Sequence, residues 1–252
     1  MVFVHSFDPV LLSIGFLSIR WYGLFFALGF IVSYLYVRSR VKREFLKISL
    51  EDLDVFMLWL VAGVVVGARL VYVLFYNFSL YLSQPLTIFA LWTGGLSFHG
   101  GLAGALFVGW FFCRRRNIQF LHFVDQWVVP AGFALGLGRI ANFMNGELYG
   151  RPTSLPWGVL FPGVSEARHP SQLYESAKNF FIFGVLFFSR DKHWPVGLRT
   201  AIFLVLYGAL RFSIEFVRQP EIVVLGLSMG QWLSLPVFLI GAFMVWKRTK
   251  IV

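Results

Sequence analysis

Two pairs of polar residues in the chain have the spacing and the chemistry of an anion-binding site. Arg139 and Asn142 are three residues apart, and Arg211 and Glu215 are four residues apart. Each pair shares one face if its segment is helical. A guanidinium presents a planar fork of donors that fits the oxygens of a phosphate. We therefore expect Arg139 and Arg211 to bind an anion, with Glu215 partly neutralising and orienting Arg211.

A lone histidine, His99, stands in the glycine-rich segment GGLSFHGGLAG (94–104). Imidazole exchanges a proton near neutral pH, so His99 is a candidate general base. A lone histidine is more often structural, however, and Gly100 and Gly104 predict close packing of one helix against another. Taken alone, the residues leave both roles open.

The elements that position these residues are predicted from the hydropathy of the chain. The sequence has 252 residues, of which 58% are hydrophobic and 13% charged, and its mean hydropathy is +0.73. Soluble domains are about 25% charged, so the composition excludes a soluble fold, a disordered chain and a disulfide scaffold. We predict an all-α polytopic membrane protein, in which each helix needs about 20 apolar residues to span the bilayer. Seven ranges fit: 17–37, 55–76, 96–113, 122–141, 175–189, 198–217 and 231–247.

Basic residues predict the orientation of these helices. Thirteen of the 22 Lys and Arg residues follow the first, third, fifth and seventh predicted spans. Cytoplasmic loops collect Lys and Arg, so the N-terminus is predicted to lie outside and the C-terminus in the cytoplasm. The formal charge of +10 is thereby explained as a topology signal, and nucleic acid is not an expected partner. The first residues lack the basic flank of a signal peptide, which predicts an uncleaved first helix.

Two segments do not fit a spanning helix. The stretch 86–93 is apolar but too short, and we interpret it as interfacial or re-entrant. The connection 142–174 is rich in Gly, Pro and polar residues and also holds several aromatic ones, which favours a folded periplasmic cap. We expect 1–252 to form a single transmembrane catalytic domain with this small head.

In this orientation the cations inside the membrane gather toward the outer leaflet. Arg69, Arg139 and Arg211 fall in the outer halves of their predicted spans. An Arg at mid-bilayer costs about 2.5–3.5 kcal/mol, so each needs a partner, a wet cavity or a route to the interface. A structural pairing explains Arg69 at least as well as a ligand does, whereas Arg139 and Arg211 favour a functional site. The phosphate available at this depth belongs to a phospholipid headgroup.

Several kinds of catalytic motif are missing from the sequence. It has no His, Cys and Glu cluster with metal-ligand spacing, so no metal is expected, and it has neither a G-x-S-x-G elbow nor a P-loop. Its single cysteine, Cys113, lies at the predicted cytoplasmic end of a span, opposite the arginines. If the protein is an enzyme, we expect the nucleophile to belong to a substrate.

Five blocks of the sequence resemble those of one bacterial family, the prolipoprotein diacylglyceryl transferases. The most specific block is GLGRIANFMNGELYGRPT (136–153). The others follow in family order: WYGLFFALGF (21–30), GGLSFHGGLAG (94–104), HPSQLYE (169–175) and YGALRFSIEFVRQPE (207–221). The resemblance implies seven helices in the bacterial cytoplasmic (inner) membrane, an external N-terminus and a periplasmic head.

The resemblance also implies an activity. The family transfers the sn-1,2-diacylglyceryl group from phosphatidylglycerol to the lipobox cysteine thiol of a preprolipoprotein, which forms a thioether and releases glycerol 1-phosphate. This is the first step of bacterial lipoprotein maturation, and the family requires no metal or organic cofactor. The family's functional residues match this sequence at Tyr22, His99, Arg139, Asn142, Glu147, Gly150, Tyr207, Arg211 and Glu215.

A mechanistic hypothesis assigns roles to these matches. Arg139 and Arg211 hold the lipid phosphate and stabilise its charge as the ester bond breaks. Asn142 and Tyr22 orient the headgroup. His99 is the first candidate for the base that removes the thiol proton, and its other possible role is a hydrogen bond to the headgroup.

The remaining matched residues are expected to support the site. Glu147 and Glu215 hold the arginines in place rather than carry protons. Gly150 serves a tight turn in the cap, and Tyr207 belongs to the supporting set.

Two other classes of protein share some of these features. An anionic-lipid transporter or flippase would also use intramembrane arginines, but its path would leave polar residues at several depths, and the inner halves of the spans are almost wholly apolar. A retinal protein, or another seven-helix receptor, is the second class. Its Schiff base would need a buried lysine, for which Lys178 is the only candidate.

Overall fold

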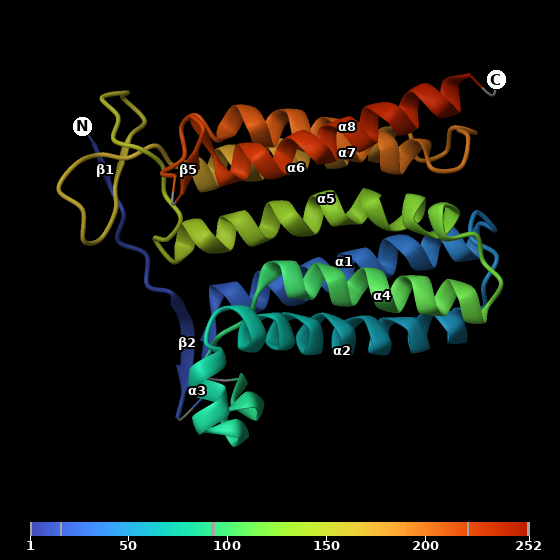
Figure 1. Ribbon diagram of the computed structural model, residues 1–252, viewed down its shortest axis with the longest axis horizontal. Helices are drawn as coiled ribbons and strands as arrows, with labels where there is room; N and C mark the ends of the chain where they lie inside the picture. Colours follow the sequence, from blue (N-terminus) through green and yellow to red (C-terminus); the bar gives the residue numbers. More distant parts are fainter. Residues whose placement is uncertain (1, 16, 92–93, 221, 251–252) are drawn as a thin grey trace. The chain divides into compact units, whose positions relative to one another are not determined.

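The computed structural model describes residues 2–15, 17–91, 94–220 and 222–250, and the chain is mainly helical (Figure 1). Seven helices of 17 to 26 residues occur in these ranges. They are α1 (Trp21–Lys42), α2 (Leu50–Phe75), α4 (Phe98–Arg115), α5 (Phe120–Met144), α6 (Ser171–Phe188), α7 (Leu198–Ile214) and α8 (Met229–Thr249).

Each predicted span overlaps one of these helices. The fifth was the shortest prediction, and its helix α6 begins earlier, at Ser171. Among the residues that the structure describes, four helices, α1, α2, α5 and α8, are long and apolar enough to cross a membrane. These apolar helices agree with a membrane protein, while the number of seven spans stays a prediction.

The chain forms two compact units. One unit consists of the chain up to Val37 and from Asp125 onward, and the other of Arg38–Val124. The first unit contains α6, α7, α8 and most of α1 and α5, whereas the second contains α2 and α4. The single catalytic domain expected from the sequence stays a prediction.

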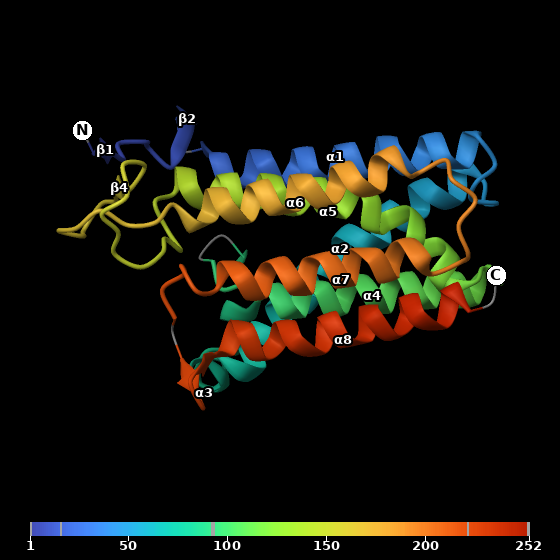
Figure 2. The same cartoon turned by 90° about the horizontal axis from the view of Figure 1, so that it is seen from above.

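Small residues bring the helices of the first unit close together. Gly132 of α5 lies against the backbone of Phe183 in α6, and the Ser176 hydroxyl donates to the Gly136 carbonyl across the same pair (2.9 Å). Gly208 of α7 meets the backbone of Phe238 in α8. Figure 2 shows α7 and α8 running side by side. The backbones of α5 and α6, and of α7 and α8, are therefore in close contact.

A carboxylate from α5 supports the start of α7. Gly197 precedes this helix with a φ of 87°, a left-handed conformation that glycine adopts without strain. Asp125 accepts from the backbone N–H groups of Gly197 (2.6 Å) and Thr200 (2.8 Å). These are donors that the first turn of a helix leaves unpaired. Asp125 is therefore buried for a structural reason.

The connection between α5 and α6 is irregular and is tied to the N-terminus. The helices end at Met144 and begin again at Ser171, so this connection is shorter than the predicted cap, 142–174. Strand β1 (Phe3–Val4) pairs in parallel with β4 (Val159–Leu160). His5 Nε2 lies 2.6 Å from the Phe143 carbonyl oxygen. Two antiparallel hairpins are formed by β2 (Val10–Ile14) with β3 (Leu17–Arg20), and by β5 (Val223–Val224) with β6 (Leu227–Ser228).

In the second unit, α2 and α4 pack backbone to backbone. A Cβ added to Gly104 of α4 would overlap the Gly63 carbonyl oxygen of α2, and one added to Gly100 would overlap that of Gly67. Glycine at these positions allows the close approach that small residues give membrane helices. The packing predicted for the segment 94–104 is confirmed.

Arg69 of α2 has a structural partner. Its guanidinium donates to the carbonyl oxygens of Thr87, Ile88, Ala90 and Gly94 and to that of Gly95, at 2.6–3.2 Å. The segment that Arg69 holds includes α3 (Phe78–Ser83) and the 3-10 helix η1 (Pro85–Phe89). The helix η1 overlaps the stretch 86–93, which was predicted to be interfacial or re-entrant. Residues 92 and 93 of that stretch lie outside the described residues. These contacts favour a structural role for Arg69 over a contact with a ligand.

Gly104→Leu tests the packing of α2 on α4. The added side chain has no space against the Gly63 backbone, so we expect a loss of about 1–3 kcal/mol in the free energy of unfolding, as for overpacked cores. Denaturant titration in detergent micelles measures this loss. Gly184→Ala in α6 is the matched control, because nothing lies within 4 Å of the Cβ it adds. Equal unfolding midpoints for Gly104→Leu and the wild type would contradict the interpretation.

Candidate functional site

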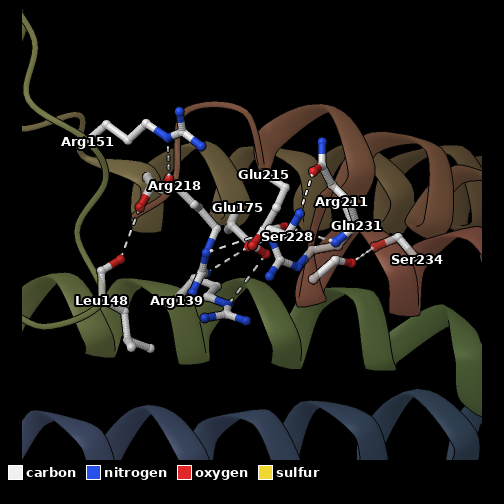
Figure 3. A network of polar contacts seen from close by, with 12 residues as sticks. Arg139, Leu148, Arg151, Glu175, Arg211, Glu215, Arg218, Ser228, Gln231 and Ser234 are labelled. Carbon is white, nitrogen blue, oxygen red and sulfur yellow. Dashed lines mark hydrogen bonds and ion pairs between the residues drawn. The ribbon is translucent and has the colours of Figure 1, made fainter. Parts of the chain in front are cut away.

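A buried carboxylate, that of Glu175, lies at the centre of a cluster of cations (Figure 3). Its Oε1 is 3.0 Å from Arg211 Nη1 and 3.1 Å from Arg218 Nη1. Its Oε2 is 3.1 Å from Lys178 Nζ and 3.6 Å from Arg139 Nε. The Glu175 side chain is completely buried, so one carboxylate is shared by four cations within the first unit. We call these five residues, together with Glu215, the charge cluster.

Three helices supply the charge cluster. Glu175 stands near the start of α6, Arg139 near the end of α5, and Arg211 in the last turn of α7. Arg218 follows α7 after one further turn of chain. Because α6 runs opposite to α5 and α7, these ends meet at the same end of the bundle (Figure 2).

A second carboxylate, Glu215, holds Arg211 from the same helix. The two side chains form an ion pair four residues apart, as their spacing predicted. Glu215 Oε2 also lies 3.6 Å from Arg218 Nε. Gly230, in the first turn of α8, leaves room for this carboxylate, since a Cβ there would overlap it. Glu215 therefore orients Arg211, in the place assigned to it from the sequence.

Lys178 forms the closed side of the cluster. Its side chain is 2% exposed, its ammonium donates to Glu175, and it stands 4.0 Å from the centre of the Tyr207 ring. Tyr207 thus packs on the cluster from α7. The ion pair and the cation–π contact therefore account for the burial of Lys178, and no covalent partner is needed to explain it.

The arginines form the open side. Arg139 has a side-chain exposure of 25%, and Arg211 and Arg218 of 14% each. Four cations against two carboxylates leave the cluster with a formal charge of +2. Three partly exposed guanidiniums side by side favour an anion with several oxygens, such as a phosphate ester.

Asn142 extends the polar face from Arg139 along α5. Arg139 Nη1 lies 3.5 Å from Asn142 Oδ1, and Asn142 Nδ2 donates to Glu147 Oε1 at 2.8 Å. Glu147 was expected to hold an arginine, but its hydrogen bonds are to Asn142 and Asn145. It acts on Arg139 through Asn142. Its backbone carbonyl is fixed by Gln172 Nε2 of α6 (2.6 Å).

Tyr22 also belongs to this neighbourhood. It lies in the first turn of α1, stacks on Phe26 and is 42% exposed. Its hydroxyl is close enough to Glu147 and Arg139 for their charges to act on it, while Arg139, Asn142 and Glu147 are joined by hydrogen bonds.

Gly150 serves a close approach and not a turn. Its φ is not positive. Its backbone N–H donates to the His169 carbonyl (2.8 Å), and its backbone forms an antiparallel β-bridge with that of Arg218. A Cβ there would overlap the Val217 carbonyl oxygen. The tight turn expected from the sequence is wrong, because the need for glycine arises from chain segments that meet only in the folded protein. This close contact joins the cap to the segment after α7 that carries Arg218.

An apolar groove of about 490 Å³ lies on the other face of α7, lined by Leu210 and Ile214 together with Leu155 and Trp157 of the cap. At its rim, Trp157 Nε1 donates to the Tyr174 hydroxyl (2.8 Å), which lies 3.2 Å from His169 Nδ1. Burial lowers the pKa of His169, which favours the neutral ring in this pair. The C-terminal end of α7 thus separates a charged face from an apolar one.

His99 belongs to the other unit. It is the second residue of α4, after Ser97, whose hydroxyl caps the helix, and it is exposed beside the Phe98 ring. Among the residues that the structure describes, no group of three His, Cys, Asp or Glu side chains is arranged to hold a metal ion. Cys113, near the end of α4, is buried.

The sequence analysis did not identify three features of the site: Glu175, Arg218 and the pairing role of Lys178. Glu175 ends the block 169–175, and Lys178 stands three residues later, a spacing that places both on one face of a helix. An acidic and a basic residue together in an apolar helix are a signal for a buried pair. The three arginines that join them come from other segments, so their contribution is visible only in three dimensions.

Comparison with known proteins places the chain in one family. The sequence profile described as prolipoprotein diacylglyceryl transferase matches residues 9–247. Proteins named phosphatidylglycerol–prolipoprotein diacylglyceryl transferase are similar to this chain over nearly their whole length. The one from Cupriavidus pinatubonensis is 45% identical over 99% of this chain and 95% of its own length. Those from Geobacter sulfurreducens and Bordetella avium are 45% and 46% identical, over 97% and 94% of this chain and 96% and 92% of their own lengths.

Proposed function

The chain belongs to the prolipoprotein diacylglyceryl transferase family, and we propose that it transfers the sn-1,2-diacylglyceryl group of phosphatidylglycerol to the lipobox cysteine thiol of a preprolipoprotein. A carbon–sulfur bond forms at the glycerol carbon that carries the phosphate ester. The bond from this carbon to the phosphate oxygen breaks, and glycerol 1-phosphate leaves. The step needs neither a metal nor an organic cofactor, and it begins lipoprotein maturation.

The observation that carries this proposal is the charge cluster around Glu175. Its formal charge of +2 and its three partly exposed arginines match an anionic phosphodiester. Arg139 and Arg211 bind the phosphate from two different helices. As the ester bond breaks, negative charge grows on the leaving oxygen, and donors already in place stabilise it without reorganisation.

Tyr22 and Asn142 orient the headgroup beside Arg139. Asn142 is held by Glu147, so its amide has a defined direction. The Tyr22 hydroxyl, within reach of the same charges, adds a donor that fits the free hydroxyls of a glycerol headgroup.

We further propose that the seven long helices span the bacterial inner membrane with the charge cluster toward the periplasmic leaflet. Glu215 of the cluster lies beside Gly230 at the start of α8, whereas Lys247 and Arg248 end this helix. Within the first unit, the cluster and these basic residues therefore occupy opposite ends. Basic ends face the cytoplasm, which supports a site that opens on the other side.

His99 is proposed as the base for the thiol. A free cysteine has a pKa near 8.5, so only a small fraction is thiolate at neutral pH. An imidazole that removes the proton increases the attacking species. The exposed position of His99 at the start of α4 agrees with access to a substrate.

A reconstituted transfer assay tests the function. The purified protein, in vesicles that contain phosphatidylglycerol labelled in its diacylglyceryl group, receives a lipobox peptide with either Cys or Ser at the acceptor position. We expect a labelled thioether with Cys and no product with Ser, because the alkoxide of Ser is not formed at neutral pH. Labelled lipid that moves between leaflets while no product forms would instead support a flippase.

Arg139→Gln and Arg211→Gln test the phosphate-binding arginines. Loss of one pre-positioned donor to the developing charge lowers turnover by about 10²–10³-fold in other enzymes, and we expect a fall in kcat/KM of at least that order. Lys247→Gln, an exposed cation at the far end of α8, is the matched control and should keep wild-type activity. If either arginine variant keeps more than a third of the wild-type kcat/KM, its phosphate role is wrong.

His99→Gln tests the base. The variant keeps a hydrogen-bonding side chain but loses the titrating group, so we expect a large fall in turnover at neutral pH and partial recovery at alkaline pH, where the peptide thiol ionises unaided. The measurement is the pH profile of kcat from about pH 6 to 9.5. A variant that keeps full activity and an unchanged profile would exclude His99 as the base.

A further inference from the structure

We propose that Glu175 is a positioning residue for the transfer reaction: its buried carboxylate sets the relative placement of Arg139, Arg211 and Arg218, and through them the geometry of the bound phosphate. This inference rests on the function proposed above. The sequence analysis gave no role to Glu175, the last residue of the block 169–175.

The first support is the division of contacts between the two carboxylate oxygens. Oε1 lies between Arg211 and Arg218, and Oε2 lies between Arg139 and Lys178. Arg139 stands on α5 and Arg211 on α7, and Glu175 of α6 is the acceptor that both contact. The two guanidiniums carry like charges and repel each other, and the negative charge of the Glu175 carboxylate offsets this repulsion. The carboxylate therefore determines the distance between the two phosphate-binding groups.

The second support is the rigidity of the helix that carries Glu175. Ser176, the next residue, donates to the Gly136 carbonyl of α5, and Ser171 donates to the Leu148 carbonyl (3.0 Å). Gln172 of the same turn donates to Glu147. The first turn and a half of α6 is thereby fixed both to α5 and to the chain that follows α5, so the carboxylate cannot follow the arginines if they move.

The third support is burial. The Glu175 side chain has no exposed surface, whereas each of the three arginines has some. Glu175 therefore does not touch the lipid and acts through the arginines. Lys178, almost fully buried on the closed side, balances the charge of the carboxylate without competing for the phosphate.

Removal of this negative charge separates binding from turnover. In Glu175→Gln the formal charge of the cluster rises from +2 to +3, so attraction for an anionic headgroup is kept or increased. The guanidiniums lose the acceptor that aligns them, and a misplacement of about 1 Å lowers a rate by up to about 10²-fold. We expect kcat to fall at least about tenfold while KM for phosphatidylglycerol stays equal or falls. A purely structural role would lower the amount of folded protein and leave kcat per folded molecule unchanged.

The experiment measures kcat and KM for phosphatidylglycerol vesicles, per folded molecule, with a lipobox cysteine peptide. Glu175→Asp keeps the charge and moves it, and its kcat should lie between those of the wild type and Glu175→Gln. Glu166→Gln, an exposed carboxylate in the cap, is the matched control and should behave as the wild type. A kcat of Glu175→Gln within twofold of the control, or a raised KM with unchanged kcat, would overturn the proposal.

A double variant keeps the test decisive if Glu175→Gln does not fold. Glu175→Gln with Lys178→Met removes the buried ammonium that would lose its partner, and it restores the formal charge of +2. We expect this protein to fold and still turn over at least about tenfold more slowly than the wild type. Recovery of wild-type kcat would overturn the positioning role. A wild-type protein that forms no thioether would refute the transfer function itself, and this outcome is separate from either variant result.

Discussion

A charge buried between helices is stable only where an opposite charge is in contact with it and its hydrogen-bonding groups are satisfied. Glu175 meets this condition with four cations, which come from α5, α6, α7 and the chain after α7. The remainder of the first unit serves that arrangement. Glycines bring α5 against α6 and α7 against α8, and the cap attaches to the chain beside Arg218 through Gly150. An incomplete set of partners would leave an uncompensated charge, so the cluster is also a reason why these helices hold one arrangement.

The helices were predictable because a bilayer imposes one simple constraint. Backbone groups in hydrocarbon must bond within their own segment, so a run of apolar residues of sufficient length becomes a helix. This reasoning found α1, α2 and α8 from hydropathy alone, and it found α6 although its first turn is polar. The ends of the helices were less exact, because they depend on caps such as Ser49 before α2 and on Asp125, which reaches α7 from a distant part of the chain. Such contacts leave no periodic pattern in the sequence.

The site was predictable where partners stand on one helix and unpredictable where they do not. The pair Arg211 and Glu215 was expected from its spacing and is present. Glu147 was expected beside an arginine, and it contacts asparagines instead. Glu175 was overlooked, since a single carboxylate becomes important only when α5 and α7 deliver their arginines to it. Arg69 shows the same rule from the other side: its acceptors are carbonyl oxygens, which every residue possesses and no sequence pattern marks.

The pair Glu175 and Lys178 has a consequence for how the protein enters its membrane. A helix that carries isolated charges partitions poorly from an insertion channel into lipid, and α6 and α7 are not among the helices apolar enough to cross a membrane by length and composition alone. Because the two residues lie on one face of α6, they can neutralise each other before α7 has been synthesised. Arg211 follows on the next helix, and in the folded protein it contacts the same carboxylate. The charge that α6 carries is thereby reduced within α6 itself, and the helices on either side of it in the chain supply further cations.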